Sequence, residues 1–219
     1  MSHGLKSRSY GAPARFVHWL AVLFVLMLPA GAAAETKTIV AFGDSLTAGY
    51  RLAQDEGFAP QLETVLNRRG LDVRVVNAGV SGETSAGGRA RVGWTLDNMA
   101  VKPDLLILEL GANDMLRGLN PRETLRNLNA IIEEVDARGI PILLTGMLAT
   151  PNVGEANFRY FNSIYPFLAD RHGTAFYPFF LRGVALRQDY LLDDFLHPNA
   201  NGVRIIAQGI APTVVEALQ

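Results

Sequence analysis

The feature that most constrains the fold of this sequence is a regular alternation of short apolar runs with longer amphipathic stretches. The runs that we expect to be strands are residues 38–42, 73–76, 105–110, 142–146 and, more weakly, 175–177. They are apolar almost throughout instead of alternating with polar residues. Runs of this kind are typical of a parallel sheet that is covered on both faces.

The stretches between these runs have the spacing of helices. Residues 58–69, 121–138 and 155–172 are each followed by a glycine, which is the common stop signal of a helix. Residues 199–218 form a fourth helical stretch, although Pro212 should disturb its last part. The sequence therefore predicts the α/β class: a single doubly wound domain, with a mostly parallel sheet between two layers of helices.

The first 34 residues differ from the rest of the chain. Lys6, Arg8 and Arg15 precede any acidic residue, an apolar run of about 13 residues (16–28) follows, and residues 30–34 read Ala-Gly-Ala-Ala-Ala. This pattern predicts a cleavable signal peptide over residues 1–34, a domain over residues 35–219, and a secreted or periplasmic protein. The alternative is an uncleaved membrane anchor, but the apolar run is shorter than the roughly 17–25 residues that span a bilayer, so we expect no stable membrane insertion after cleavage.

Charge and cysteine content exclude several function classes. Loss of three positive residues with the leader would change the formal net charge from −1 to −4, and no basic stripe remains, so we expect no nucleic-acid partner. The absence of cysteine excludes a thiolate nucleophile and a thiolate metal site. No histidine cluster accompanies Glu109 and Asp114, so we expect no metal site.

Polar or glycine residues follow three of the predicted strands. Ser45 in Gly-Asp-Ser-Leu, Gly79 in Asn-Ala-Gly and Asn113 in Gly-Ala-Asn-Asp each come directly after an apolar run. Ligands of doubly wound sheets bind beyond the carboxyl ends of the strands. We therefore expect Ser45, Gly79 and Asn113 to share one site.

Ser45 is the candidate nucleophile, and a serine hydroxyl needs a base to remove its proton. Its alternative role is to cap a helix N-terminus. Ser81 is a rival that is more typical of a glycine-rich turn, and no serine lies in a Gly-x-Ser-x-Gly elbow.

His197 is the candidate base, and Asp194 lies three residues before it, where a carboxylate could orient the imidazole. Beyond the leader, His172 is the only other histidine, and its place at a predicted helix end favours a structural role.

Four sequence blocks, around Ser45, Gly79, Asn113 and His197, resemble those of the GDSL or SGNH hydrolase family. The resemblance implies an SGNH-hydrolase domain of flavodoxin-like fold and a Ser45–His197–Asp194 triad, with Asp194 preferred to Asp193 by the family pattern Asp-x-x-His-Pro. It also implies an oxyanion hole made of the Ser45 N–H, Gly79 and Asn113, and no cofactor.

Segments outside the blocks, such as residues 161–166 and 178–181, are similar to the arylesterase, acyl-CoA thioesterase and lysophospholipase branch. The resemblance thus implies a serine esterase whose partner is a small-molecule acyl ester or thioester. Two alternatives stay open: a carbohydrate O-deacetylase that uses the same site, and a non-catalytic module that binds lipid. We expect the apolar connection after residue 146 to border the acyl group.

Overall fold

The computed structural model describes residues 1, 3–4, 36–150 and 154–219. The chain divides into two compact units, Met1–Glu35 and Thr36–Gln219. Apart from Met1, His3 and Gly4, the predicted signal peptide lies outside the described residues, so it stays a prediction. In the part of the chain that is described, no helix is both long and apolar enough to span a membrane.

The second unit contains a five-stranded sheet in the order β2-β1-β3-β4-β5, and every pair of neighbouring strands is parallel. The strands are β1 (Lys37–Gly43), β2 (Val73–Gly79), β3 (Leu105–Glu109), β4 (Ile142–Thr145) and β5 (Ala175–Tyr177). This order is that of flavodoxin-like sheets, in which the chain winds outward in both directions from a central strand. The predicted fold class and all five predicted strands are confirmed.

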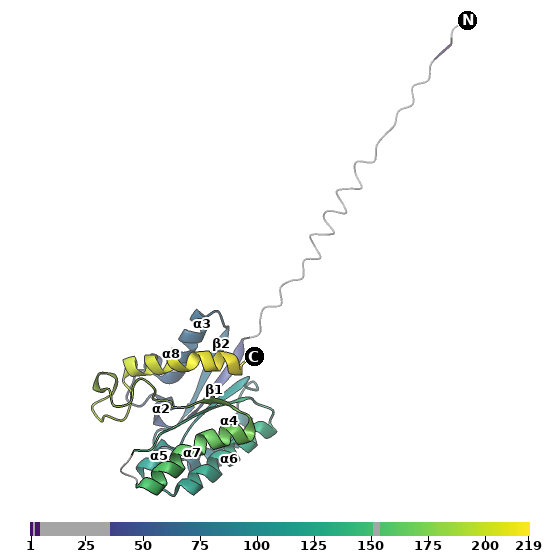
Figure 1. The fold of residues 1–219 in the computed structure, drawn as a ribbon. Helices are drawn as coiled ribbons and strands as arrows, with labels where there is room; N and C mark the ends of the chain where they lie inside the picture. The colour runs from purple at the N-terminus through teal and green to yellow at the C-terminus, as the bar shows by residue number, and fades with distance from the viewer. Residues whose placement is uncertain (2, 5–35, 151–153) are drawn as a thin grey trace. The chain divides into compact units, whose positions relative to one another are not determined.

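Helices cover both faces of this sheet (Figure 1). The helix α3 (Phe58–Arg68) packs beside α8 (Ala200–Ala217) on one face, and α4 (Ser85–Asp97), α6 (Pro121–Ala137) and α7 (Glu155–His172) cover the other. Two short helices, α2 (Ser45–Ala48) and α5 (Ala112–Leu116), follow β1 and β3 directly. Short 3-10 helices lie at η1 (Gln54–Glu56) and η3 (Gln188–Tyr190).

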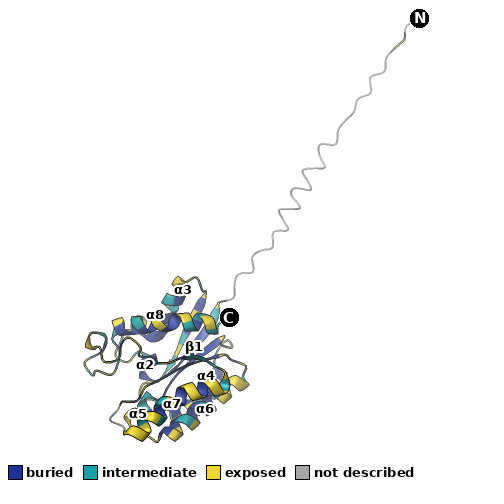
Figure 2. Ribbon diagram, in the orientation of Figure 1, coloured by how far each residue is buried: buried dark blue, intermediate teal, exposed yellow. Residues whose placement is uncertain are grey.

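The core lies on both sides of the two central strands. Four residues of β1 and four of β3 are almost wholly inaccessible to solvent: Ile39, Val40, Ala41, Phe42, Leu105, Leu106, Ile107 and Leu108. Each helix that covers the sheet turns its buried side toward these strands and its exposed side outward (Figure 2). Burial of apolar area on both faces makes this sheet a rigid support for the loops at its carboxyl edge.

The structure differs from the sequence-based expectation in three places. Helix α4 is not signalled by the sequence, because Gly87, Gly88 and Gly93 weaken both its apolar pattern and its helix propensity. Helix α8 continues through Pro212, held by the buried residues around it. The segment 77–79 forms the end of β2 instead of following the strand.

Candidate active site

Ser45 lies where strand β1, a neighbour of the middle strand β3, ends and α2 begins. The cap of α2 is Asp44, whose Oδ1 accepts the N–H of Leu46 at 3.0 Å. Ser45 is therefore not the cap itself, and its hydroxyl is available for another partner. As the first residue of α2, Ser45 also has a backbone N–H without an acceptor inside the helix.

The structure brings His197 to Ser45 although 152 positions separate them in the sequence. The His197 Nε2 lies 2.8 Å from the Ser45 Oγ, and the His197 Nδ1 lies 2.8 Å from the Asp194 Oδ2. A carboxylate can only accept a hydrogen bond, so Nδ1 carries the hydrogen and Nε2 is left to accept the serine proton. The three side chains thus form one continuous hydrogen-bonded chain.

Asp194 also shapes the turn that carries His197. Its Oδ1 accepts the backbone N–H groups of Leu196 and His197 at 2.9 and 3.0 Å, while Phe195 takes a positive φ of 57°. Partial burial tends to raise the pKa of Asp194, but the hydrogen bonds from His197 and Leu196 lower it to about 2. Asp194 is therefore ionised at neutral pH, as an orienting carboxylate must be.

The rival residues lie elsewhere. Asp193 is exposed, and Ser81 is exposed in a turn after β2. The His172 Nε2 lies 2.9 Å from the Asn129 Oδ1, at the end of α7 that precedes β5. The structure therefore favours Asp194 and His197 over these alternatives.

Asn113 lines the same pocket as Ser45 and His197. Gly111, with a φ of 114°, turns the chain after β3 and places Asn113 in the first turn of α5. The Asn113 Nδ2 donates to the Asp44 Oδ2 at 3.0 Å and to the Glu83 carbonyl at 2.9 Å. Both hydrogens of this amide are engaged, so donation to a substrate requires one of these bonds to yield or to be shared.

Gly79 does not fit the predicted role. It ends β2 opposite Gly43, its N–H donates to the Asn77 Oδ1 at 2.9 Å, and it lines a different hollow from the one at Ser45. A Cβ at this position would lie 2.3 Å from the Ala48 backbone nitrogen, so the glycine is needed for close packing against α2. The expected grouping of Ser45, Gly79 and Asn113 is therefore wrong for Gly79.

Gly82 is the residue that the sequence reasoning missed. It has a positive φ of 80°, and the next residue's carbonyl is held by Asn113. Its own carbonyl accepts from Arg117 at 2.6 Å, while its N–H has no hydrogen-bond acceptor among the described residues. The sequence signal was the Gly-Val-Ser-Gly run after β2, in which the second glycine and not the first lies beside Asn113.

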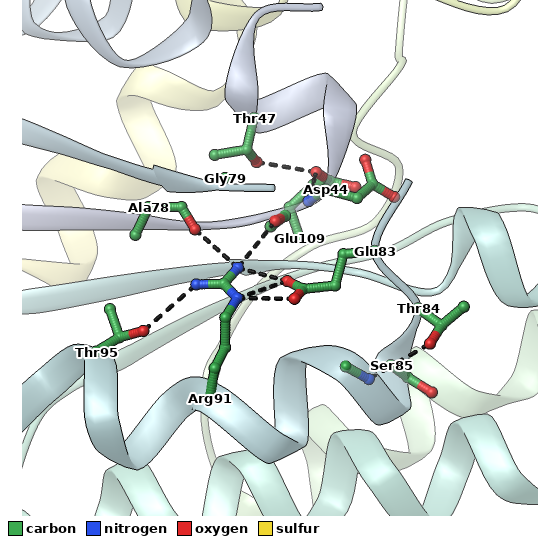
Figure 3. A network of polar contacts seen from close by, with 12 residues as sticks. Asp44, Thr47, Ala78, Gly79, Glu83, Thr84, Ser85, Arg91, Thr95 and Glu109 are labelled. Atoms are coloured by element: carbon green, nitrogen blue, oxygen red, sulfur yellow. Dashed lines mark hydrogen bonds and ion pairs between the residues drawn. The ribbon is translucent and has the colours of Figure 1, made fainter. Parts of the chain in front are cut away.

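Arg91 on α4 connects the segment around Gly82 to the ends of two strands (Figure 3). Its guanidinium forms a bidentate pair with Glu83 and donates to the carbonyls of Gly43 and Ala78 at 3.2 and 2.8 Å. These two carbonyls belong to the carboxyl ends of β1 and β2. Arg91 therefore ties the segment that contains Gly82 and Glu83 to the strand that leads into Ser45.

A pocket of about 200 Å³ opens beside Ser45. Its wall is mainly apolar and comes from the loops that follow β1, β3, β4 and β5. The larger apolar residues are Leu46, Met115, Leu116, Met147, Leu148, Phe179, Leu181, Leu186, Leu191, Phe195 and Leu196. Such a wall suits the hydrocarbon part of a ligand whose polar group meets Ser45 and His197.

Asp114 has a structural role in this arrangement. Its carboxylate accepts from the backbone N–H and hydroxyl of Ser85 and from the Thr124 hydroxyl, and so it joins α4, α5 and α6.

Within residues 36–150 and 154–219, no three histidine, aspartate or glutamate side chains are grouped so that they could hold a metal ion.

Comparison with known proteins shows the family to which this chain belongs. The sequence profile of the GDSL-like lipase/acylhydrolase family matches residues 41–205. The chain is 34% identical over 202 residues to an arylesterase of Vibrio mimicus, which covers 92% of this chain and all of the relative. It is 35% identical over 192 residues to thioesterase 1/protease 1/lysophospholipase L1 of Escherichia coli, covering 88% of this chain and 89% of the relative.

The fold has solved counterparts as well. The crystal structure of AlinE4, an SGNH-hydrolase family esterase, superimposes with a TM-score of 0.72 at 47% identity, covering 84% of this chain and 98% of AlinE4. A parallel sheet with a serine and a histidine joined at its carboxyl edge defines a hydrolase of the serine type. The chain belongs to the GDSL-like lipase/acylhydrolase family.

Proposed function

We propose that this protein is a serine esterase that hydrolyses carboxylic acyl esters through an acyl-enzyme formed on Ser45. The observation that carries the proposal is the chain of two 2.8 Å contacts from Ser45 through His197 to Asp194. A serine becomes nucleophilic when a base accepts its proton and a third group orients that base. The arylesterase and esterase names of the relatives support the same reaction.

The first half of the reaction forms the acyl-enzyme. The Ser45 Oγ attacks the carbonyl carbon while the His197 Nε2 takes the hydroxyl proton, and Asp194 stabilises the imidazolium that results. When the tetrahedral intermediate collapses, the proton passes from Nε2 to the leaving alkoxide. In the second half, His197 takes a proton from water, the hydroxide attacks the acyl carbon, and Ser45 leaves with the proton returned.

We assign three donors to the oxyanion that forms on the substrate carbonyl. They are the N–H of Ser45, the side-chain amide of Asn113 and the N–H of Gly82, which replaces the predicted Gly79 because its N–H has no acceptor among the described residues. Donors already aimed at a developing oxyanion contribute roughly 2.7–4 kcal/mol each. For Asn113, the approaching oxyanion replaces or shares a bond that the amide now makes to Asp44 or Glu83.

The apolar pocket supports an acyl or aryl group as the preferred part of the substrate. Leu148 and Phe195 on its rim are 45% and 61% exposed, so they present apolar surface to an incoming ligand. Lysophospholipids and acyl thioesters meet the same requirement, and thioester and lysophospholipid activities are named for the Escherichia coli relative. We propose both as further substrates of the Ser45 site.

A fluorophosphonate probe tests the nucleophile. The native protein should become labelled, and Ser45→Ala should not, whereas Ser81→Ala serves as the matched control and should still label. A panel of p-nitrophenyl esters, acyl-CoA thioesters and acetylated sugars then ranks the substrates. Labelling that persists in Ser45→Ala would count against the proposal.

The same panel separates the two alternatives. Turnover confined to acetylated sugars would identify a carbohydrate O-deacetylase, in which the apolar wall has no acyl chain longer than acetyl to hold. Lipid binding without labelling or turnover would identify a non-catalytic module.

We also propose that the protein is exported to the periplasm or the medium. The charged leader, the apolar run and the Ala-x-Ala sequence at residues 32–34 support this proposal. N-terminal sequencing of the natural product should begin at Glu35. A product that begins at Met1 or Ser2 would contradict cleavage.

A further inference from the structure

A buried carboxyl group that the proposed reaction does not use contacts the residues on either side of Ser45 in the chain. Glu109, the last residue of β3, is fully buried and pairs with Gly43 of β1. Its Oε2 accepts the Thr47 hydroxyl at 2.9 Å and the Asp44 backbone N–H at 3.3 Å (Figure 3). Glu109 thus contacts the residue before the nucleophile and a residue two positions after it.

The surrounding backbone is adapted to this side chain. A Cβ at Gly43 would lie 2.6 Å from the Glu109 Oε2 and 2.2 Å from the Thr47 Oγ1. The first glycine of the Gly-Asp-Ser-Leu segment therefore leaves the room in which the Glu109 carboxyl and the Thr47 hydroxyl meet. Gly43 of β1, Glu109 of β3 and Thr47 of α2 therefore pack closely together.

The hydrogen-bond pattern favours a neutral carboxyl at Glu109. Its Oε1 is buried and has no partner among the described residues, so a negative charge there would lack a donor. The Glu109 Oε2 lies 3.3 Å from the Asp44 backbone nitrogen, and Asp44 is itself fully buried, so two carboxyl groups lie close together away from solvent. Two buried carboxyl groups in such proximity disfavour double ionisation, so one of them keeps a proton.

No positive charge compensates this pair. Arg91, the cation on the neighbouring α4, is paired with Glu83, and neither Asp44 nor Glu109 forms an ion pair with any described residue. The other titratable groups that interact with the pair are Tyr165 on α7, which is also near Asp114, and His197 on the loop before α8.

We propose that Glu109 is a positioning residue of the Ser45 site and that it works in its protonated form. In this form it donates to the Asp44 carboxylate and accepts from the Asp44 N–H and the Thr47 hydroxyl. Asp44, held in this way, caps α2 through the Leu46 N–H and accepts the Asn113 amide. Glu109 therefore sets the direction of both the nucleophile and an oxyanion donor without touching the substrate.

The electrostatic environment supports this assignment. Burial, and next the charge of Asp44, raise the pKa of Glu109 well above its usual range. Burial also raises the pKa of Asp44, to about 6, although hydrogen bonds from Leu46 and Asn113 oppose the rise. Glu109 thus keeps the shared proton while Asp44 is ionised at neutral pH.

The first test detects the proton on Glu109 by its effect on how folding stability depends on pH. A folded-state pKa above the unfolded value gives stability that is fully present below the unfolded pKa and is lost as the pH rises through the folded pKa. Glu109→Gln cannot ionise, so its ratio of folded to unfolded protein should rise relative to that of the native protein as the pH rises from about 5 to about 8. This relative rise should be at most about tenfold per pH unit.

Chemical denaturation of the native protein and of Glu109→Gln across this pH range measures the effect. The control is Glu216→Gln, which removes an exposed carboxylate from α8. If Glu109→Gln shows the same flat difference as the control, Glu109 is ionised in the folded protein and the proposal is overturned. This outcome does not depend on the protein's being an esterase.

The second test measures, by enzyme kinetics, whether Glu109 positions the Ser45 site, and it rests on the proposed function. Glu109→Gln keeps the hydrogen bonds and should retain kcat near neutral pH to within about twofold. Glu109→Met, which is of similar length but makes none of these bonds, should lower kcat by about 10- to 100-fold with little change in KM.

Equal activity of Glu109→Met and the native protein would overturn the positioning role, as would a Glu109→Gln variant as impaired as Glu109→Met. If the native protein itself neither reacts with a fluorophosphonate nor hydrolyses esters, the proposed function fails. The stability comparison then still decides whether Glu109 carries the proton.

Discussion

The phenol ring of Tyr50 packs against the imidazole of His197, with the ring centroids 4.5 Å apart and the ring planes inclined by 39°. Tyr50 follows the left-handed Gly49 that ends α2, and its backbone N–H donates to the Ser45 carbonyl at 3.2 Å. The short segment that carries the nucleophile therefore also carries the ring that covers one side of the base.

Removal of the Tyr50 ring should loosen His197 between Ser45 and Asp194. We expect Tyr50→Ala to lower kcat by about tenfold or more, because misplaced reacting groups lose much of their rate. Tyr50→Phe keeps the ring and is the matched control, with kcat close to that of the native protein. Equal kcat in all three proteins would show that the contact does not hold the imidazole.

Ser45 and His197 should behave as one unit. Ser45→Ala and His197→Ala should each remove nearly all turnover, and the double variant should be little worse than either single variant. Single-turnover kinetics on a p-nitrophenyl ester measures all three. Losses that multiply independently would argue against a shared mechanism.

Asn113 should act mainly on the transition state. We expect Asn113→Ala to lower kcat by roughly 10²–10³ with little change in KM, since the oxyanion is fully charged only in the transition state. Steady-state kinetics separates the two constants. A change in KM alone would make Asn113 a contact of the ground-state substrate.

Leu148 should set the preference for acyl chain length. It lies on the rim of the Ser45 pocket, so Leu148→Ala should weaken turnover of long-chain esters more than of acetyl esters, by roughly 1–3 kcal/mol. Leu119→Ala, which alters a neighbouring hollow instead, is the control. Kinetics on a chain-length series of one ester decides, and equal losses across the series would place the acyl group elsewhere.

The lowered pKa of Asp194 predicts a pH dependence of stability. A depressed carboxyl pKa gives stability that is present above the unfolded value of 3.8 and is lost as the pH falls through about 2. The native protein should therefore exceed Asp194→Asn in denaturation midpoint at pH 7, and this difference should shrink toward about pH 2. A difference that stays constant would mean that Asp194 is not held as an ion. Asp194→Asn should also lower kcat by about 10⁴, because the new amide can donate to Nδ1 and so favours the tautomer in which Nε2 carries the hydrogen and cannot accept the serine proton.

Most of the fold followed from hydrophobic pattern, because strands buried on both faces leave continuous apolar runs. Helix α4 escaped this reasoning for a physical reason. At Gly88 a Cβ would lie 2.3 Å from a methyl group of Leu110, the residue after β3, so this close packing favours a glycine, which also weakens helix propensity. Tertiary packing, and not helix propensity, therefore determines that α4 is helical.

The site was only partly predictable in the same way. Ser45, His197 and Asp194 were proposed from the chemistry of a serine nucleophile together with the resemblance to the GDSL family, and the structure places their side chains in hydrogen-bonding contact. The glycine was assigned to position 79 instead of 82 because a sequence does not tell which N–H is already bonded: that of Gly79 is engaged by Asn77. The role of Glu109 depends on its contacts with Asp44 and Thr47, which are more than 60 positions away in the sequence. No local sequence pattern predicts such contacts.

The loop of His197 leads directly into α8, the last helix of the chain, and α8 packs against α3, which follows β1. The base therefore reaches the nucleophile only after the two ends of the domain have come together. Every chain that stops short of His197, on a ribosome or after proteolysis, carries Ser45 without a partner for its proton. Recovery of ester hydrolysis during refolding should thus follow the final docking step and not the earlier collapse of the sheet, so that enzyme activity reports complete assembly of the chain.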